Sequence, residues 1–159
     1  MSNIKLIISM ITVIFMIGCY GTNLTIHQKY IYASSDTFSY EIIEEAKLSE
    51  EGMAIFKMRL ESKLKVLKLI SEEKGTSNKL IEITFNNYYM RHGAARALAG
   101  VMTGVDNITS TVLIKDKDSG TIVGKFQVVS ENPTAVISAR ALIEEHADKI
   151  ANYIKTGKK

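Results

Sequence analysis

Hydrophobic residues alternate with polar ones near the start of the chain and again in its middle. Apolar side chains fall at every second place within residues 24–33, and residues 80–89 repeat the pattern with Ile81, Ile83 and Phe85 on one side. Because successive side chains of a strand point to opposite faces, each segment is predicted to be a strand with one buried face. Two further strands are predicted to flank the turn at 116–120, where Asp, Ser and Gly favour chain reversal.

Two other stretches repeat their apolar residues every three or four positions, which is the period of a helix. The first begins at Ser49, a plausible N-cap followed by two glutamates, and is predicted to end at the stop signal Lys74–Gly75 after about six turns. The second covers residues 136–154, after Pro133 has interrupted the preceding strand. Both helices are expected to bury one apolar face.

The order strand, helix, strand, strand, strand, helix predicts an α+β fold. We expect a mostly antiparallel sheet of about four strands, with the two amphipathic helices on one of its faces. All of the apolar stripes would then share a single core, so residues 24–159 are predicted to form one domain.

The N-terminal segment has the layout of a signal peptide. Lys5 is the only charged side chain before Cys19, and residues 6–17 are almost wholly apolar. This run is short of the roughly 20 residues that a permanent transmembrane helix needs. Residues 1–18 are therefore expected to be removed by cleavage after Gly18.

Residues 16–19, Met-Ile-Gly-Cys, resemble the lipobox of bacterial lipoproteins. The thiol of Cys19 would carry the diacylglycerol, and a further acyl chain on the amino group would make the anchoring in the bilayer stable. Residues 19–23 are expected to be a lipidated tether. Tyr20 stands where an aspartate would favour the inner membrane, so the resemblance implies an outer-membrane, periplasm-facing protein. An ordinary signal peptide with an accidental cysteine remains the alternative.

The overall charge argues against nucleic acid as a partner. The formal net charge is +3, and the lysines and arginines are interleaved with acidic residues along the predicted helices. A nucleic-acid-binding domain would be expected to gather its basic residues into a patch or stripe. The single cysteine, Cys19, leaves no second thiol for an intramolecular disulfide.

No motif for catalysis or metal binding occurs in the sequence. The nucleophile elbow, the phosphate-binding loop and the zinc-protease helix are all absent, and the three histidines lie far apart. One of them, His146, is expected at the boundary of the apolar face of the last helix. We therefore predict no enzyme activity, no catalytic residues, no cofactor and no metal site.

Residues 91–105, RHGAARALAGVMTGV, are rich in glycine and alanine and show no strand alternation. One interpretation is a flexible glycine-rich connection that enters the next strand. The other is a docking loop for another protein or for the membrane, in which the two arginines face anionic groups. The residues assigned to this possible docking loop are Arg91, Gly93, Arg96, Gly100 and Gly104.

Residues 83–126 resemble the DUF4410-type envelope lipoproteins, a bacterial family of uncharacterised function. The family's core runs from a strand through a glycine-rich, arginine-containing loop into a strand that ends in an Asp and Gly turn. The resemblance implies an α+β lipoprotein domain with no known catalytic residues. The matching positions are Gly93, Arg96, Gly100, Gly104, Asp116 and Gly120.

Two functional hypotheses follow from these observations. The first is an accessory or scaffold lipoprotein that holds an envelope protein partner, because the chain combines a lipid anchor with a complete small core and no catalytic set. The alternative is a periplasmic module that binds a small ligand or lipid. Its apolar cleft would lie between sheet and helices, lined by Met53, Phe56 and Phe85.

Overall fold

The computed structural model describes residues 20–70, 76–91, 104–133 and 136–158, which contain five strands and two helices. In chain order these are β1 (Gly21–Gln28), β2 (Phe38–Glu44), α2 (Glu50–Val66), β3 (Lys79–Tyr89), β4 (Asp106–Asp116), β5 (Ile122–Asn132) and α4 (Ala139–Thr156). The strands form one sheet in the order β1-β5-β4-β3-β2, and β2 is the only one of them that runs parallel to its neighbour.

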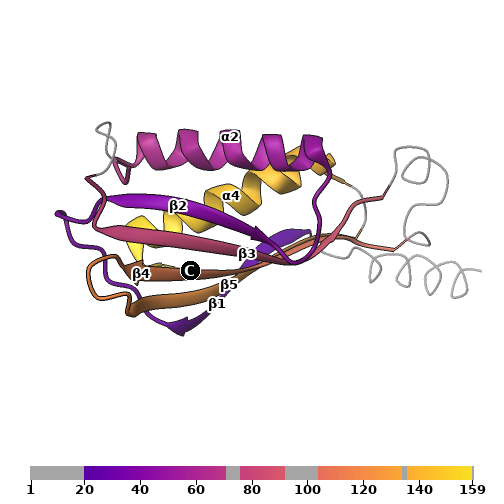
Figure 1. Ribbon diagram of the computed structural model, residues 1–159. Helices are drawn as coiled ribbons and strands as arrows, with labels where there is room; N and C mark the ends of the chain where they lie inside the picture. The colour runs from indigo at the N-terminus through magenta and orange to yellow at the C-terminus, as the bar shows by residue number, and fades with distance from the viewer. Residues whose placement is uncertain (1–19, 71–75, 92–103, 134–135, 159) are drawn as a thin grey trace, which may run out of the picture.

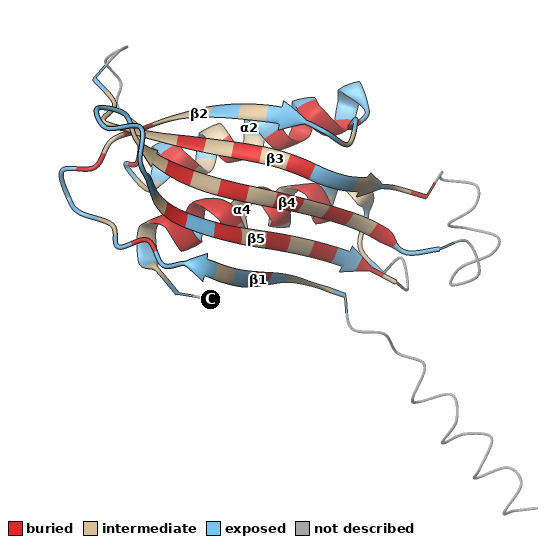
Figure 2. Cartoon of the chain, turned by 60° about the horizontal axis from the view of Figure 1, so that its bottom comes forward, coloured by how far each residue is buried: buried red, intermediate tan, exposed pale blue. Residues whose placement is uncertain are grey.

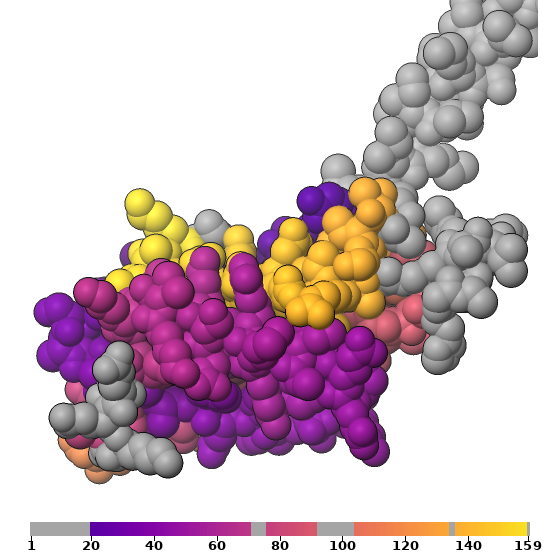
Figure 3. All heavy atoms as spheres, turned by 90° about the horizontal axis from the view of Figure 1, so that it is seen from above, coloured from indigo at the N-terminus to yellow at the C-terminus, as the bar shows by residue number. Residues whose placement is uncertain are grey.

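Both helices cover the same face of the sheet, as the sequence predicted (Figure 1). Seen from the helix side, α2 and α4 lie next to each other, and Arg59 of α2 donates two hydrogen bonds to Asp148 of α4 (Figure 3). Neither of the two described helices lies on the opposite face of the sheet (Figure 2). The predicted α+β class is therefore confirmed, and among the described residues no helix is long and apolar enough to cross a bilayer.

The sheet has five strands, so the prediction of about four antiparallel strands was incomplete. The missing strand is β2, which pairs in parallel with β3 and forms one edge of the sheet. Its inward positions are apolar, but Ile43 points outward and is exposed, which breaks the alternation that marks a strand. An edge strand with this pattern resembles a polar connection in the sequence.

The helix α2 ends at Val66, well before the predicted stop at Lys74–Gly75. Lys68 adopts a left-handed conformation with φ of 54°, and the amide of Leu69 donates back to the carbonyl of Leu64. Leu69 is fully buried, and its carbonyl accepts a hydrogen bond from the amide of Phe38 at the start of β2. The apolar period continued beyond Val66 because these residues still enter the core, although not as a helix.

Each helix is preceded by a serine that serves as its N-cap. The Ser49 hydroxyl accepts a hydrogen bond from the amide of Gly52, as expected of the predicted N-cap, and Ser138 does the same for Ala141. The second helix therefore starts at Ala139 and not at residue 136. Each cap satisfies one of the backbone amides that the first turn of a helix leaves without a partner.

The first strand begins earlier than predicted. β1 covers Gly21–Gln28 instead of residues 24–33, and it pairs with β5 from its first residue. Most of the expected tether, residues 19–23, is thus part of the sheet. Only Tyr20 separates β1 from Cys19, which itself lies outside the described residues together with Gly18.

The core between the helices and the sheet is closely packed. Phe56 of α2 and Phe85 of β3 are fully buried with ring centroids 4.9 Å apart, so the ligand cleft expected between sheet and helices is filled by the protein's own side chains. His146 is not at a boundary. It is fully buried, and its two ring nitrogens lie 2.7 Å from the Ser110 hydroxyl and 2.8 Å from the Ser130 hydroxyl. Burial lowers its pKa to about 3, which keeps the ring neutral.

Candidate binding cleft

One end of the sheet gathers the start of β1 and the ends of β3 and β5. The strand pairing aligns Gly21 with Glu131, Glu131 with Asn107, and Asn107 with Tyr89 in one row across four strands. Both helices also begin on this side of the molecule (Figure 1). We call it the proximal end because β1 starts there, and the opposite end is the distal end.

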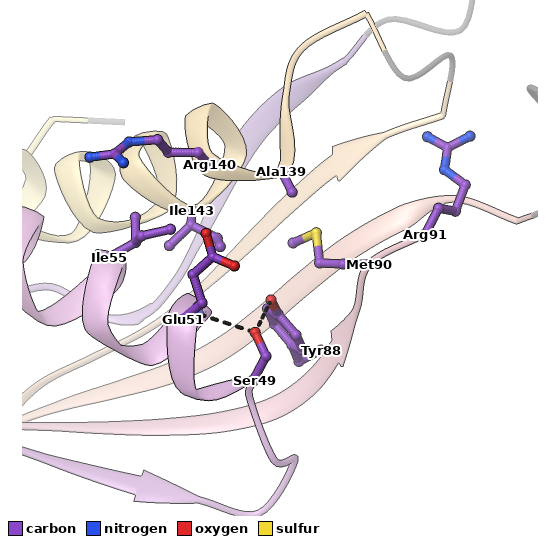
Figure 4. A pocket seen from close by; sticks show the side chains of 10 residues that line it. Ser49, Glu51, Ile55, Tyr88, Met90, Arg91, Ala139, Arg140 and Ile143 are labelled. Atoms are coloured by element: carbon purple, nitrogen blue, oxygen red, sulfur yellow. Dashed lines mark hydrogen bonds between the residues drawn. The ribbon is translucent and has the colours of Figure 1, made fainter. Parts of the chain in front are cut away.

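A cleft of about 380 Å³ lies at the proximal end, between the first turns of α2 and α4 and the last residues of β3 (Figure 4). Its lining comes from three segments that are far apart in the sequence. The residues are Ser49, Glu51, Gly52, Ile55, Tyr88, Met90, Arg91, Ala139, Arg140 and Ile143.

The cleft combines an apolar interior with a polar rim. Ile55 of α2 and Ile143 of α4 approach each other on one side, and Met90 lies on the other (Figure 4). The rim carries the charged side chains of Glu51 and Arg140, both on exposed residues. An apolar hollow with a few polar groups at its edge is the usual form of a site that binds an apolar side chain or a small ligand.

Gly52 allows the first turn of α2 to lie against the Tyr88 side chain. A Cβ atom at Gly52 would lie 2.6 Å from the Tyr88 hydroxyl and 2.9 Å from the Ser49 hydroxyl. Because glycine has no Cβ, the phenol can rest against the first turn of α2, 3.4 Å from Ser49 Oγ. This contact joins the end of β3 to the N-cap of α2.

Arg91 forms one wall of the cleft, but its charge is already neutralised. Its side chain is fully buried, and its Nε and Nη2 atoms lie 3.2 Å and 3.1 Å from the carboxylate of Asp106. The guanidinium also donates to the carbonyls of Asn132 and Pro133. The expectation that Arg91 faces the anionic group of a partner is therefore wrong, because the anion is the chain's own Asp106.

The other residues of the predicted docking loop divide into two groups. Gly104 lies at the proximal end with φ of 92°, and a Cβ there would meet the ring of Tyr89 at 3.3 Å. Gly93, Arg96 and Gly100 lie outside the described residues. A docking role for this loop stays a prediction.

The geometry of the cleft suits binding better than catalysis. The contacts of Ser49 Oγ are a backbone amide and the Tyr88 hydroxyl, neither of which is the base that a serine nucleophile requires. Within the part of the chain that the structure describes, no group of three His, Cys, Asp or Glu residues is placed to hold a metal ion. The lack of enzyme activity stays a prediction.

The sequence contained one signal that pointed toward this cleft. Ser49, which lines the cleft, was predicted as the N-cap of the first helix, although nothing in the sequence related it to the start of the second helix. Tyr88, Met90 and Arg140 carried no signal, because each fitted its strand or helix without any feature that would relate it to the others.

Comparison with known proteins adds a family and a fold. The model of a domain of unknown function, DUF4410, matches residues 23–135. No curated protein gives a significant match.

Among solved structures, a variant of the PelC dodecamer from Paraburkholderia phytofirmans is similar to this chain, with a TM-score of 0.62 at 8% identity. The match covers 87% of this chain and 100% of the PelC chain. A second PelC dodecamer structure from the same organism has a TM-score of 0.62 at 8% identity, and the match covers 85% of this chain and 98% of the PelC chain. A Caulobacter crescentus CB15 protein, classed only provisionally as a lipoprotein, is 18% identical over 73% of this chain and 86% of that one, with a TM-score of 0.37. At these identities the PelC structures show a shared fold alone.

Proposed function

The chain belongs to the DUF4410 family of domains of unknown function, and from this premise we propose that it is a membrane-anchored scaffold protein of the bacterial cell envelope. Its task would be to hold another envelope protein, and not to transform a substrate. The observation that carries the proposal is the proximal cleft, which has a binding surface without a catalytic arrangement.

The size and lining of the cleft favour an apolar side chain of a partner protein. A volume of about 380 Å³ lies toward the lower end of ligand pockets and holds one or two large side chains. Ile55, Met90 and Ile143 would cover such a side chain, while Glu51 and Arg140 remain at the rim. Glu51 would pair with polar groups of the partner, and the guanidinium of Arg140, which already lies 2.9 Å from Glu144, could extend that ion pair to them. A buried apolar anchor with a polar rim is typical of protein interfaces.

The N-terminal sequence supports the anchoring half of the proposal. Cys19 follows a signal-peptide pattern and would be acylated, and Tyr20 in the next position favours the outer membrane. A scaffold held at the bilayer gains effective concentration toward partners in the same membrane. Even a shallow cleft can then maintain a stable contact.

The cleft also supports a second candidate function, the binding of a small ligand or lipid. The same apolar interior could accept part of an acyl chain in place of a side chain. Native mass spectrometry of the extracted protein separates the two functions, because a reproducible bound small molecule supports ligand binding and an empty protein supports the scaffold.

The scaffold proposal is tested by photocrosslinking in living cells. A photoreactive amino acid at Arg140, on the exposed rim, is expected to capture a partner, whereas the same amino acid at Ser62, on an exposed part of α2 away from the cleft, is not. Capture of a second copy would make this chain its own partner, in line with the dodecamers formed by PelC. Equal adducts at both positions, or none at position 140, would contradict the proposal.

A further inference from the structure

We infer that the proximal end rests directly on the bilayer, with Tyr20, Tyr89, Val105 and Val136 in the headgroup region. This inference depends on the proposed acylation of Cys19 and adds an orientation to it. The partner is the lipid surface that holds the anchor.

The short connection between Cys19 and the sheet carries the argument. β1 begins at Gly21, so residues 19 and 20 are the only ones between the acylated sulfur and the first strand. Two residues extend by no more than roughly 7 Å. The headgroup layer itself adds about 5 to 8 Å on each side of the hydrocarbon core. The start of β1 therefore cannot leave the surface of the membrane.

Exposed apolar and aromatic side chains gather at this same end. Tyr20 and Tyr89 are 43% and 48% exposed, and Val105 and Val136 are 37% and 70% exposed. Tyr20 directly precedes the row that joins Gly21 to Tyr89, and Val105 lies just beyond the start of β4. Tyrosine is enriched where membrane meets water because its ring is apolar and its hydroxyl is polar.

Exposed apolar residues alone would not choose this end, because the distal end carries Ile31, Val66 and Ile122. The short connection between Cys19 and β1 determines that the proximal end is the one that faces the bilayer. The long strands β3, β4 and β5 each have 11 residues, which corresponds to roughly 35 Å of extended chain. With these strands standing upright on the bilayer, the distal residues are therefore held far from it.

The charges at the proximal end limit how the domain can tilt. The corner between β2 and α2 carries Glu44, Glu45, Glu50 and Glu51, all on exposed residues. Carboxylates are unfavourable against an anionic lipid surface. This corner offsets its four glutamates with Lys47 alone, whereas the side of β1, β5 and β4 presents the exposed Glu131, so the contact lies on that less acidic side. The cleft, which includes Glu51, then opens sideways and remains accessible to a protein partner.

Site-specific fluorescence in the full-length lipoprotein tests the orientation. Val136→Cys and Val105→Cys place a single reactive thiol at the proximal end, because acylation would block Cys19, and Ile31→Cys with Val66→Cys are the matched distal controls. Each thiol receives an environment-sensitive dye, and the purified protein is incorporated into vesicles of phosphatidylethanolamine and phosphatidylglycerol that contain a lipid-borne quencher. We expect the proximal labels to be quenched at least three-fold more than the distal ones.

The result separates the orientation from the anchor. Vesicle-bound protein whose proximal and distal labels are quenched equally would overturn the orientation and leave the anchor intact. Protein that does not sediment with vesicles would overturn the anchor and, with it, the orientation that depends on it. A Cys19→Ser chain, which cannot be acylated, gives the baseline for unanchored protein.

Discussion

Both ends of the sheet carry ion pairs, but the proximal pair is buried and the distal one is in contact with water. At the proximal end, the side chains of Arg91 and Asp106 have no exposed surface. At the distal end, Lys79 lies 2.9 Å from Asp116 and 3.7 Å from Asp36, and all three side chains keep some contact with water. The distal cluster closes a tight turn, whereas the proximal pair stands beside an open cleft.

This difference in burial gives the two clusters different structural roles. A buried ion pair is not in itself stabilising, because both charges lose their hydration. The Arg91–Asp106 pair fixes the end of β3 against the start of β4, and so it positions Tyr88 and Met90 in the cleft. The distal cluster also borders a hollow, of about 340 Å³, through the Tyr30 hydroxyl that donates to Asp36, but its charged side chains keep contact with water.

Removing one member of the proximal pair should have the largest effect. We expect Asp106→Ala to lower the free energy of unfolding by about 3 to 5 kcal/mol, since Arg91 would remain buried without its counter-charge. Asp116→Ala at the distal end should lower it far less, because water replaces the lost contact. Urea denaturation of both variants measures the difference, and equal losses would mean that the two clusters play the same role.

Acid should weaken the proximal half of the core before it reaches the distal cluster. The pKa of His146 is lowered from 6.5 to about 3 by burial, so below pH 6.5 the unfolded chain takes up a proton that the folded chain does not. The stability that neutral His146 preserves is therefore lost progressively as the pH falls from 6.5 toward 3, by about 2 kcal/mol at pH 5.

Urea denaturation at pH 7 and pH 5 measures this loss. The variant His146→Gln should be less stable at pH 7 but lack this part of the pH dependence. Around Asp116 the hydrogen bonds from Ser119 and the charge of Lys79 hold the carboxyl pKa below its ordinary value. That contribution is lost only below about pH 3.8, where the unfolded carboxyl protonates. If the free energy of unfolding of His146→Gln fell between pH 7 and pH 5 as steeply as that of the native protein, the assignment of this loss to His146 would be wrong.

Glycines at the two ends should respond to alanine for different reasons. Gly52→Ala should cost about 1 kcal/mol because the new Cβ would collide with the Tyr88 hydroxyl, and a second change, Tyr88→Phe, should recover part of that loss. At the distal turn, Gly120 has φ of 70° with open space around it, so the strain of Gly120→Ala is purely conformational. Thermal unfolding would show whether Tyr88→Phe rescues Gly52→Ala and fails to rescue Gly120→Ala.

The sequence predicted the elements with a strong period and missed those without one. The strand β3, the hairpin of β4 and β5, and α4 were found because their apolar residues repeat regularly and Asp116 with Gly120 marks the turn. β2 was missed because its outward Ile43 and its edge position obscure the alternation. The helix α2 was extended too far because Leu69 is buried even though Lys68 has already left the helix.

The cleft was less predictable than the fold for a physical reason. Its residues come from the ends of three elements, and their proximity depends on strand order and register, which no local period encodes. His146 was placed on the correct helix, but its burial depended on Ser110 and Ser130, two polar residues on the inner face of the sheet. Their inward position became visible only when the strands were paired.

Filling the cleft should have the smallest effect on stability. Ala139 is the first residue of α4 and points into the cleft (Figure 4), so Ala139→Phe adds a ring to open space. We expect the free energy of unfolding to stay within about 0.5 kcal/mol of the native value. Ala54→Phe, on an exposed position of α2 outside this cleft, is the control for added bulk.

Partner capture by these two variants tests whether the proximal cleft is the binding site. The crosslinker at position 140 is combined with Ala139→Phe or with Ala54→Phe, and the captured partner is quantified after equal membrane recovery has been verified. We expect Ala139→Phe to lower capture at least ten-fold and Ala54→Phe to leave it unchanged. Capture that persists in a folded Ala139→Phe protein would show that the proximal cleft is not where this protein holds its partner.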